Sequence, residues 1–184
     1  MLSRRLHSQS VSPQNAQPKR FVLSLTVSQW QRLATELLAM EHAPHNPTVP
    51  VEKQLERDRA GEQVQIQISS ALEQTRNLAD DQQVAFTLSL VRTTAKYLLT
   101  ACDRMRRATL QQAWSTRSRA PADLPPILGE VRSWDVTMRE LSTQHGVIHP
   151  LGEMVRPLHL SDTELVALGV PCESLLNGED LLSL

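Results

Sequence analysis

A long apolar repeat in the middle of the chain limits its fold more than any other feature. Small or apolar residues recur there at alternating steps of four and three. A 3.5-residue repeat is typical of a helix that packs along one seam. Asp81 is a suitable N-cap, so we expect one helix over about residues 82–117, with a length of about 50 Å. The repeat consists of Val84, Leu88, Val91, Ala95, Leu98, Cys102, Met105 and Thr109.

Such a helix is long compared with the whole protein, which has 184 residues and as a globule would have a radius of gyration of about 16 Å. We therefore predict an all-α fold, a helical hairpin or bundle around this one long central helix. We expect an extended N-terminal arm before it and an irregular C-terminal region after it.

The predicted central helix also has apolar side chains away from its seam. A helix that is apolar on more than one side is packed on more than one side. Either other helices of a bundle or a partner chain must therefore cover these side chains. The predicted partner-binding residues are Phe86, Leu90, Tyr97 and Leu99.

Capping signals and periodicity predict further helices. Thr26 and Gln29 match a capping box, and the helix they begin should end near His42, because prolines follow at 44, 47 and 50. Its apolar stripe would be Trp30, Leu33, Leu37 and Leu38.

The segment 64–68 has a strand-like alternation, but no partner strand is evident, so we expect helix there. Residues 121–129 are expected to form a loop. A helix should follow and end near Gly146, with the stripe Val131, Trp134, Met138 and Leu141. These elements define a helical domain over 26–146.

The two ends of the chain differ in charge. Residues 1–25 form a flexible or extended arm that is basic and contains no acid. This composition is typical of a transit peptide, which predicts a mitochondrial location; as an ordinary tail, the arm would fit a bacterial cytoplasmic or exported protein. Residues 147–184 are acidic and irregular, with short helices. Within them, 164–176 is similar to a helix-turn-helix, but 161–184 has no basic residue to face DNA, so we assign no family.

Charge also varies in blocks along the interior of the chain. Residues 91–120 contain seven basic residues and one acidic residue, a net charge of +6, although the formal net charge of the whole chain is −1. Such a basic face can contact the phosphates of a nucleic acid, or it can pair with the acidic blocks of this same chain. The predicted phosphate-binding residues are Arg92, Lys96, Arg104, Arg106, Arg107, Arg117 and Arg119.

We find no pattern that predicts catalysis. The six glycines do not form a phosphate-binding loop, and the two cysteines lie seventy positions apart, at Cys102 and Cys172. Neither the pair His42 and His45 nor the pair His145 and His149 lies in a predicted helix. We therefore predict no enzyme, no cofactor and no metal site.

The function we expect from these patterns is a non-catalytic accessory or structural subunit that contacts other proteins in a larger assembly. The alternative is a nucleic-acid-associated helical protein that uses the basic face of residues 92–119. No uncharged apolar stretch is long enough to cross a membrane.

Overall fold

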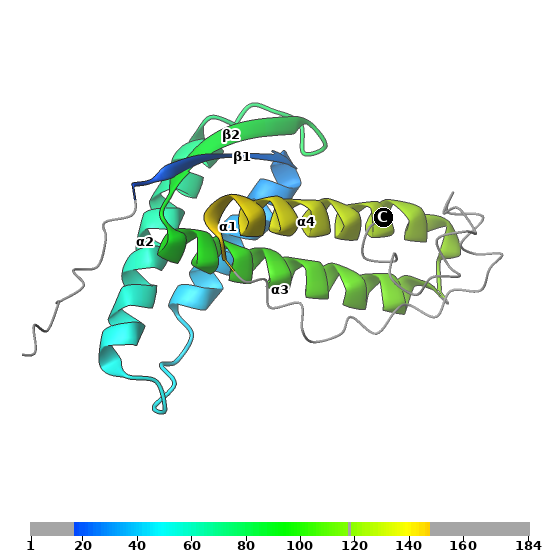
Figure 1. The fold of residues 1–184 in the computed structure, drawn as a ribbon. Coiled ribbons are helices and arrows are strands. Elements are labelled where there is room, and N and C mark those ends of the chain that lie inside the picture. The colour runs from blue at the N-terminus through cyan, green and yellow to red at the C-terminus, as the bar shows by residue number, and fades with distance from the viewer. Residues whose placement is uncertain (1–16, 118, 148–184) are drawn as a thin grey trace, which may run out of the picture.

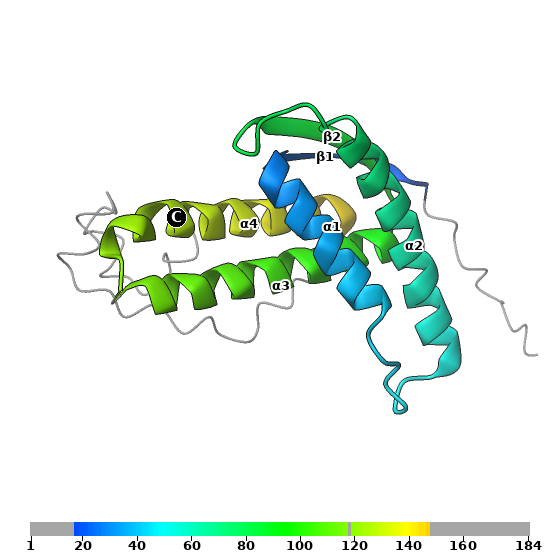
Figure 2. The same ribbon diagram turned by 180° about the vertical axis from the view of Figure 1, so that it is seen from behind.

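The computed structural model describes residues 17–117 and 119–147. Four helices and a two-stranded antiparallel sheet make up this part, with α3 and α4 side by side as a long hairpin and the sheet across one end of it (Figure 1). Seen from behind, α1 crosses α3, and α2 lies beside the end of the α3–α4 hairpin that carries the sheet (Figure 2). The elements are β1 (Lys19–Thr26), α1 (Val27–Glu41), α2 (Val51–Glu73), β2 (Gln83–Leu90), α3 (Arg92–Arg117), the short turn η1 (Pro121–Asp123) and α4 (Leu124–His145).

The sheet corrects the all-α prediction and the single helix over 82–117. Within that stretch, Gln83–Leu90 forms β2, and the helix begins only at Arg92. Val84, Phe86, Leu88 and Leu90 alternate with small or polar residues, which is the period of a strand with one covered face. Val84 and Leu88 therefore satisfy both a strand repeat and a helix repeat, and pairing with β1 decides between them.

The break between β2 and α3 lies at Val91. The Thr94 hydroxyl accepts a hydrogen bond from the Val91 amide and donates one to the Val91 carbonyl, both at 2.9 Å. The first helical amide-to-carbonyl bond, from Ala95 to Val91, is 2.8 Å. The cap thus comes from within the helix, and no N-capping residue at position 91 marks this boundary in the sequence.

β1 occupies the end of the predicted N-terminal arm. Phe21, Leu23 and Leu25 point into the core, and the residues between them are exposed. β1 pairs with β2 from Lys19 opposite Leu90 to Thr26 opposite Gln83. The arm is therefore extended from Lys19 onward, and this part of it is a strand in the folded body.

The predicted start of α1 is confirmed, because Thr26 and Gln29 form the complete capping box. Trp30, Leu33 and Leu37 are buried as expected, but Leu38 is 43% exposed. The segment 64–68 is helical within α2, where Val64 and Ile68 face the core and Ile66 faces solvent.

α4 is longer than predicted, because it begins at Leu124 within the expected loop. Pro125 and Pro126 stand in its first turn, where a helix does not need their missing amides. Its predicted stripe is buried, and Gly146 ends it in the left-handed conformation with φ 59°. The seam of α3 from Ala95 to Thr109 is also buried as predicted, and its apolar members share one core with Trp134, Met138 and Leu141.

Some predictions lie outside the described residues. These are residues 1–16 of the arm, on which the mitochondrial location depends, and all of the acidic C-terminal region except Val147. Among the helices that are described, none has the length and apolar character needed to span a membrane.

Candidate protein interface

Hydrogen bonds with the Gln67 and Gln29 side chains show which backbone N–H and C=O groups of the sheet point outward. The Gln67 amide of α2 donates to the Ser89 carbonyl at 3.1 Å and accepts from the Ser89 amide at 2.7 Å. The Ser89 backbone groups therefore point away from β1. At the other end, the Thr26 amide donates to Gln29 Oε1 at 2.9 Å instead of to β2. In an antiparallel pair the outward-pointing residues alternate along each strand.

This alternation defines an open edge on β1. Arg20 is opposite Ser89, so Arg20, Val22 and Ser24 each direct one amide and one carbonyl away from β2. Among the described residues, no side chain hydrogen-bonds these groups and no third strand joins the sheet. The edge of β2, in contrast, is closed at Ser89 by Gln67. An unpaired edge is a template for another strand.

A groove of about 410 Å³ lies along this open edge, between β1 and α4. Phe21 to Ser24 form its β1 wall, with Gln83 at one end. Gly129 leaves space in the α4 wall, since a Cβ built there meets nothing within 4 Å. The other α4 residues of the groove are Arg132, Ser133, Val136, Thr137 and Glu140.

Two exposed valines lie in the middle of this groove. Val22 on β1 is 58% exposed and Val136 on α4 is 45% exposed. Arg132 and Glu140 stand one turn before and one turn after Val136, and both are exposed. The groove thus combines apolar surface, opposite charges and free backbone groups, which are the components of a protein interface.

The apolar residues predicted to bind a partner are instead covered by the chain itself. Leu90 and Leu99 are 0% and 1% exposed, and Tyr97 is 6% exposed. Phe86 packs edge-to-face on Trp30, with ring centroids 5.2 Å apart. The bundle alternative therefore holds for these side chains, because β1, α1, α2 and α4 surround the segment that carries them.

The predicted phosphate-binding residues do not form one face. Arg106 is 2% exposed and forms ion pairs with Asp135 of α4 and with Asp103, so it cannot reach a phosphate in this fold. Arg107 pairs with Asp103 at 2.9 Å, and Arg104 pairs with Glu36 of α1 at 2.6 Å. Arg117 is partly buried and already engaged by a neighbouring group, whereas Arg92, Lys96 and Arg119 are exposed.

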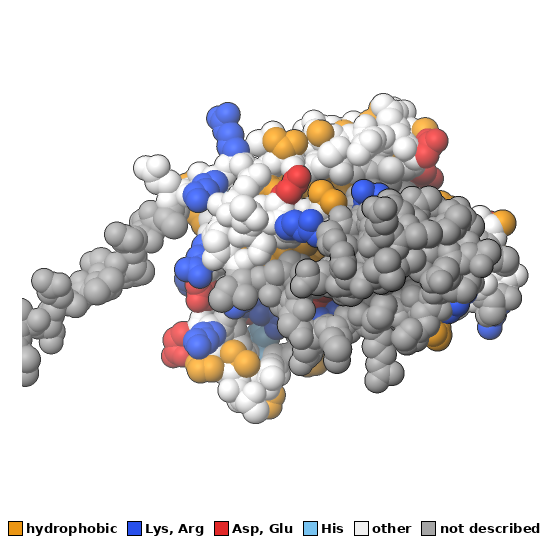
Figure 3. Space-filling model, turned by 45° about the vertical axis from the view of Figure 1, so that its right-hand side comes forward, with side chains coloured by type: hydrophobic (Ala, Val, Ile, Leu, Met, Phe, Trp, Pro, Cys, Tyr) orange, Lys and Arg blue, Asp and Glu red, His pale blue; other side chains and the backbone are white. Residues whose placement is uncertain are grey.

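These ion pairs neutralise part of the charge of the basic block. In Figure 3, Lys and Arg side chains on the visible face are interspersed with acidic ones. The acidic partners in these ion pairs are Glu36 of α1, Asp103 of α3 and Asp135 of α4. Glu36 and Asp135 lie outside the basic block, as the alternative of pairing within the chain predicts, whereas Asp103 lies inside it. The nucleic-acid alternative keeps only the exposed cations as its support.

A second polar cluster joins α1, α3 and α4. The Glu130 carboxylate pairs with Arg32 at 2.6 Å and accepts hydrogen bonds from Thr109 at 3.3 Å and from Trp134 Nε1 at 3.1 Å. Burial raises the pKa of Asp135 in the neighbouring cluster, and Arg106 opposes this shift. Both clusters link helices to one another, which indicates a structural role.

Among the residues that the structure describes, Cys102, His42 and His45 are placed unfavourably for chemistry. Cys102 is fully buried, and burial raises the pKa of its thiol to about 12, so it has almost no thiolate at neutral pH. His45 pairs with Asp58 at 3.1 Å, and His42 Nδ1 contacts the Leu38 carbonyl at 2.8 Å. No group of three or more potential metal ligands occurs in the part of the chain that the structure describes.

Sequence reasoning missed the residues of the groove, although a signal for them was present. Phe21, Leu23 and Leu25 alternate with Val22 and Ser24 in the sequence. This pattern is compatible with a strand that has one covered face, and the alternation in 84–90 predicts a second strand with which it can pair. No known protein family, curated protein or solved structure matches this chain.

Proposed function

We propose that this protein is a non-catalytic assembly subunit that joins polypeptides through the open edge of β1 and the adjoining face of α4. The observation that carries this proposal is the groove along an unpaired strand edge, with Val22 and Val136 exposed at its centre. The first partner of this surface is a second copy of the same chain.

The arrangement of charge along α4 supports a second copy. Arg132 and Glu140 are each four residues from Val136, on opposite sides. When two copies of α4 lie antiparallel with Val136 on a two-fold axis, Arg132 faces Glu140 of the partner subunit, and Glu140 faces Arg132 of the partner subunit. A surface that complements itself in this way is what a two-fold dimer requires.

Pairing through the open edge of β1 is compatible with the same two-fold axis. When β1 pairs antiparallel with its copy around Val22, Arg20 lies opposite Ser24 of the partner subunit, so no like charges face each other. Each new backbone hydrogen bond contributes about 0.5–1.5 kcal/mol. The two strand pairs become one four-stranded sheet, and the groove is filled by the valines of both copies.

The mass of the full chain in solution tests this proposal. Light scattering after size-exclusion chromatography, over a range of concentrations, should show a dimer. Arg132→Glu and Glu140→Arg should each raise the dimer dissociation constant at least tenfold, because each places like charges opposite one another. An equimolar mixture of the two variants should restore the dimer, because every cross-axis pair is then of opposite charge.

Glu62→Arg on the exposed side of α2 is the matched control for charge reversal and should leave the dimer unchanged. A wild-type chain that stays monomeric at all concentrations contradicts the proposal, as do single variants that dimerise normally. Circular dichroism confirms that each variant is folded. Binding of a different protein to a chain that remains monomeric would contradict the self-pairing.

A further inference from the structure

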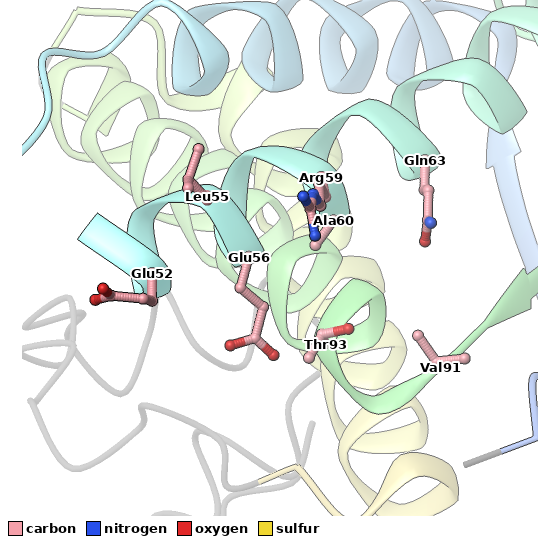
Figure 4. Close-up of a pocket in the computed structure, with 8 residues that line it drawn as sticks. All are labelled: Glu52, Leu55, Glu56, Arg59, Ala60, Gln63, Val91 and Thr93. Carbon is pink, nitrogen blue, oxygen red and sulfur yellow. The ribbon is translucent and has the colours of Figure 1, made fainter. Parts of the chain in front are cut away.

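Two adjoining hollows lie where α2 crosses the beginning of α3. One of them has a volume of about 420 Å³, and Figure 4 shows α2 residues on one side of it and Val91 and Thr93 on the other. The second hollow, of about 470 Å³, extends toward α1 and the loop before α2. The two share Glu56, Ala60 and Thr93. Each volume is typical of a site for a small molecule.

The larger hollow, which we call the α2–α3 hollow, is lined mainly by cations among its charged residues. Lys53 and Arg57 come from α2, and Lys96 and Arg104 come from α3. Glu56 is the single acidic residue in its lining. The fold therefore brings two of the predicted phosphate-binding residues, Lys96 and Arg104, next to two cations that are about forty positions away in the sequence.

The four cations of this hollow differ in whether they already have an ion-pair or hydrogen-bond partner within the chain. Arg104 is paired with Glu36 at 2.6 Å, and Arg57 donates to the Met40 carbonyl at 3.3 Å. The ammonium groups of Lys53 and Lys96 are exposed and have no ion pair or hydrogen bond within residues 17–117 and 119–147. Two charges are therefore available for an anion, beside two that are held in position.

The remaining residues that line the hollow are uncharged. Gly61 allows Tyr97 to approach α2, since a Cβ at position 61 would lie 2.8 Å from Tyr97 Cζ. Burial raises the pKa of the Tyr97 hydroxyl, which therefore stays neutral. Thr93 and Thr100 add hydroxyl groups, and Met40, Val49 and Ala60 add apolar surface.

From this combination we infer that the α2–α3 hollow binds a small anion with two or more phosphate groups, held by Lys53 and Lys96 with Arg57 and Arg104 beside them. Lysine and arginine form charge-assisted hydrogen bonds with phosphate oxygens. The site is a bounded hollow, so the inferred ligand is a small molecule, and this binding is independent of the interface at β1. Its phosphates come either from free pyrophosphate or from the polyphosphate chain of a nucleotide.

Isothermal titration calorimetry with the full chain tests the inference, with pyrophosphate, adenosine triphosphate and adenosine as separate probes. We expect binding of one or both polyphosphates and none of adenosine. Tighter binding of adenosine triphosphate than of pyrophosphate would assign the apolar lining to the organic part of the ligand. Equal binding would assign recognition to the phosphates alone.

The double variant Lys53→Met, Lys96→Met should weaken polyphosphate binding at least tenfold. Arg20→Met, Arg76→Met is the matched control, because it removes the same total charge from exposed positions that line neither hollow, and its affinity should stay within twofold of the wild type. The inference fails if neither polyphosphate binds at millimolar concentration, if adenosine binds as well as the polyphosphates, or if both double variants lose affinity equally.

Discussion

The cations on the two sides of α3 differ in burial and in pairing. On the side facing α4, Arg106 is buried and paired with Asp135 and Asp103. On the side facing α2, Lys96 is exposed and lies with Lys53 at an open hollow. All the cations of α3 belong to one basic block of the sequence, so the neighbouring helix decides whether a cation supports the fold or remains available. Asp135 of α4 and Asp103 of α3 itself neutralise the first side, and α2 adds further cations to the second.

Removal of the buried cation should have the largest effect on stability. Arg106→Met leaves the Asp103 and Asp135 carboxylates buried close together without their shared partner. Loss of one member of a buried ion pair costs about 3–5 kcal/mol, so we expect a decrease of that order in the free energy of unfolding at pH 7. Urea denaturation followed by circular dichroism measures it.

The control for this substitution is an apolar replacement of both partners. Arg106→Met combined with Asp135→Leu should recover most of the lost stability, because it removes the unpaired charge. A single variant as stable as the wild type would show that the α4 side does not depend on this pair.

A smaller effect is expected from acid, at the junction of α4 with β1. His145 is 8% exposed and packs against Phe21, with ring centroids 6.2 Å apart. Burial lowers the pKa of His145 below 6.5, and Lys19 adds to this shift. Protonation therefore favours the unfolded chain, in which the pKa is higher. The stabilising contribution is complete above pH 6.5 and is lost as the pH falls through the pKa of the folded state.

Unfolding free energies of the wild type and of His145→Gln, measured from pH 8 to pH 5, test this expectation. The wild type should lose stability relative to the variant below pH 6.5. Parallel curves over the whole range would mean that the buried ring does not resist protonation.

The smallest change in stability should follow from substitution of the two lysines at the α2–α3 hollow. Lys53→Met, Lys96→Met removes exposed cations, including one of the like-charged pair Lys53 and Arg57 at i and i+4 on α2. Such pairs are slightly destabilising, so we expect a change within about 0.5 kcal/mol, toward greater stability. Thermal melting without ligand checks this, and a large loss would mean that these lysines support the α2–α3 contact.

The sequence alone determined the elements whose signals are local. The Thr26 and Gln29 capping box begins α1, and Gly146 ends α4 because only glycine readily adopts the left-handed conformation found there. The buried stripe of α4 and the seam of α3 from Ala95 to Thr109 followed from helical spacing within single elements. In each case the interactions that decide the conformation lie within a few residues.

Only the tertiary structure decided what 83–90 becomes and which cations stay free. Val84 and Leu88 fit a helix and a strand equally well, and the choice depends on hydrogen bonds with β1, more than fifty positions earlier. The encounter of Lys53 with Lys96, and of Arg106 with Asp135, depends in the same way on which helices pack together. A strand pattern can be seen in the sequence, but which segments pair and which charges meet depends on contacts between distant residues, which local spacing does not specify.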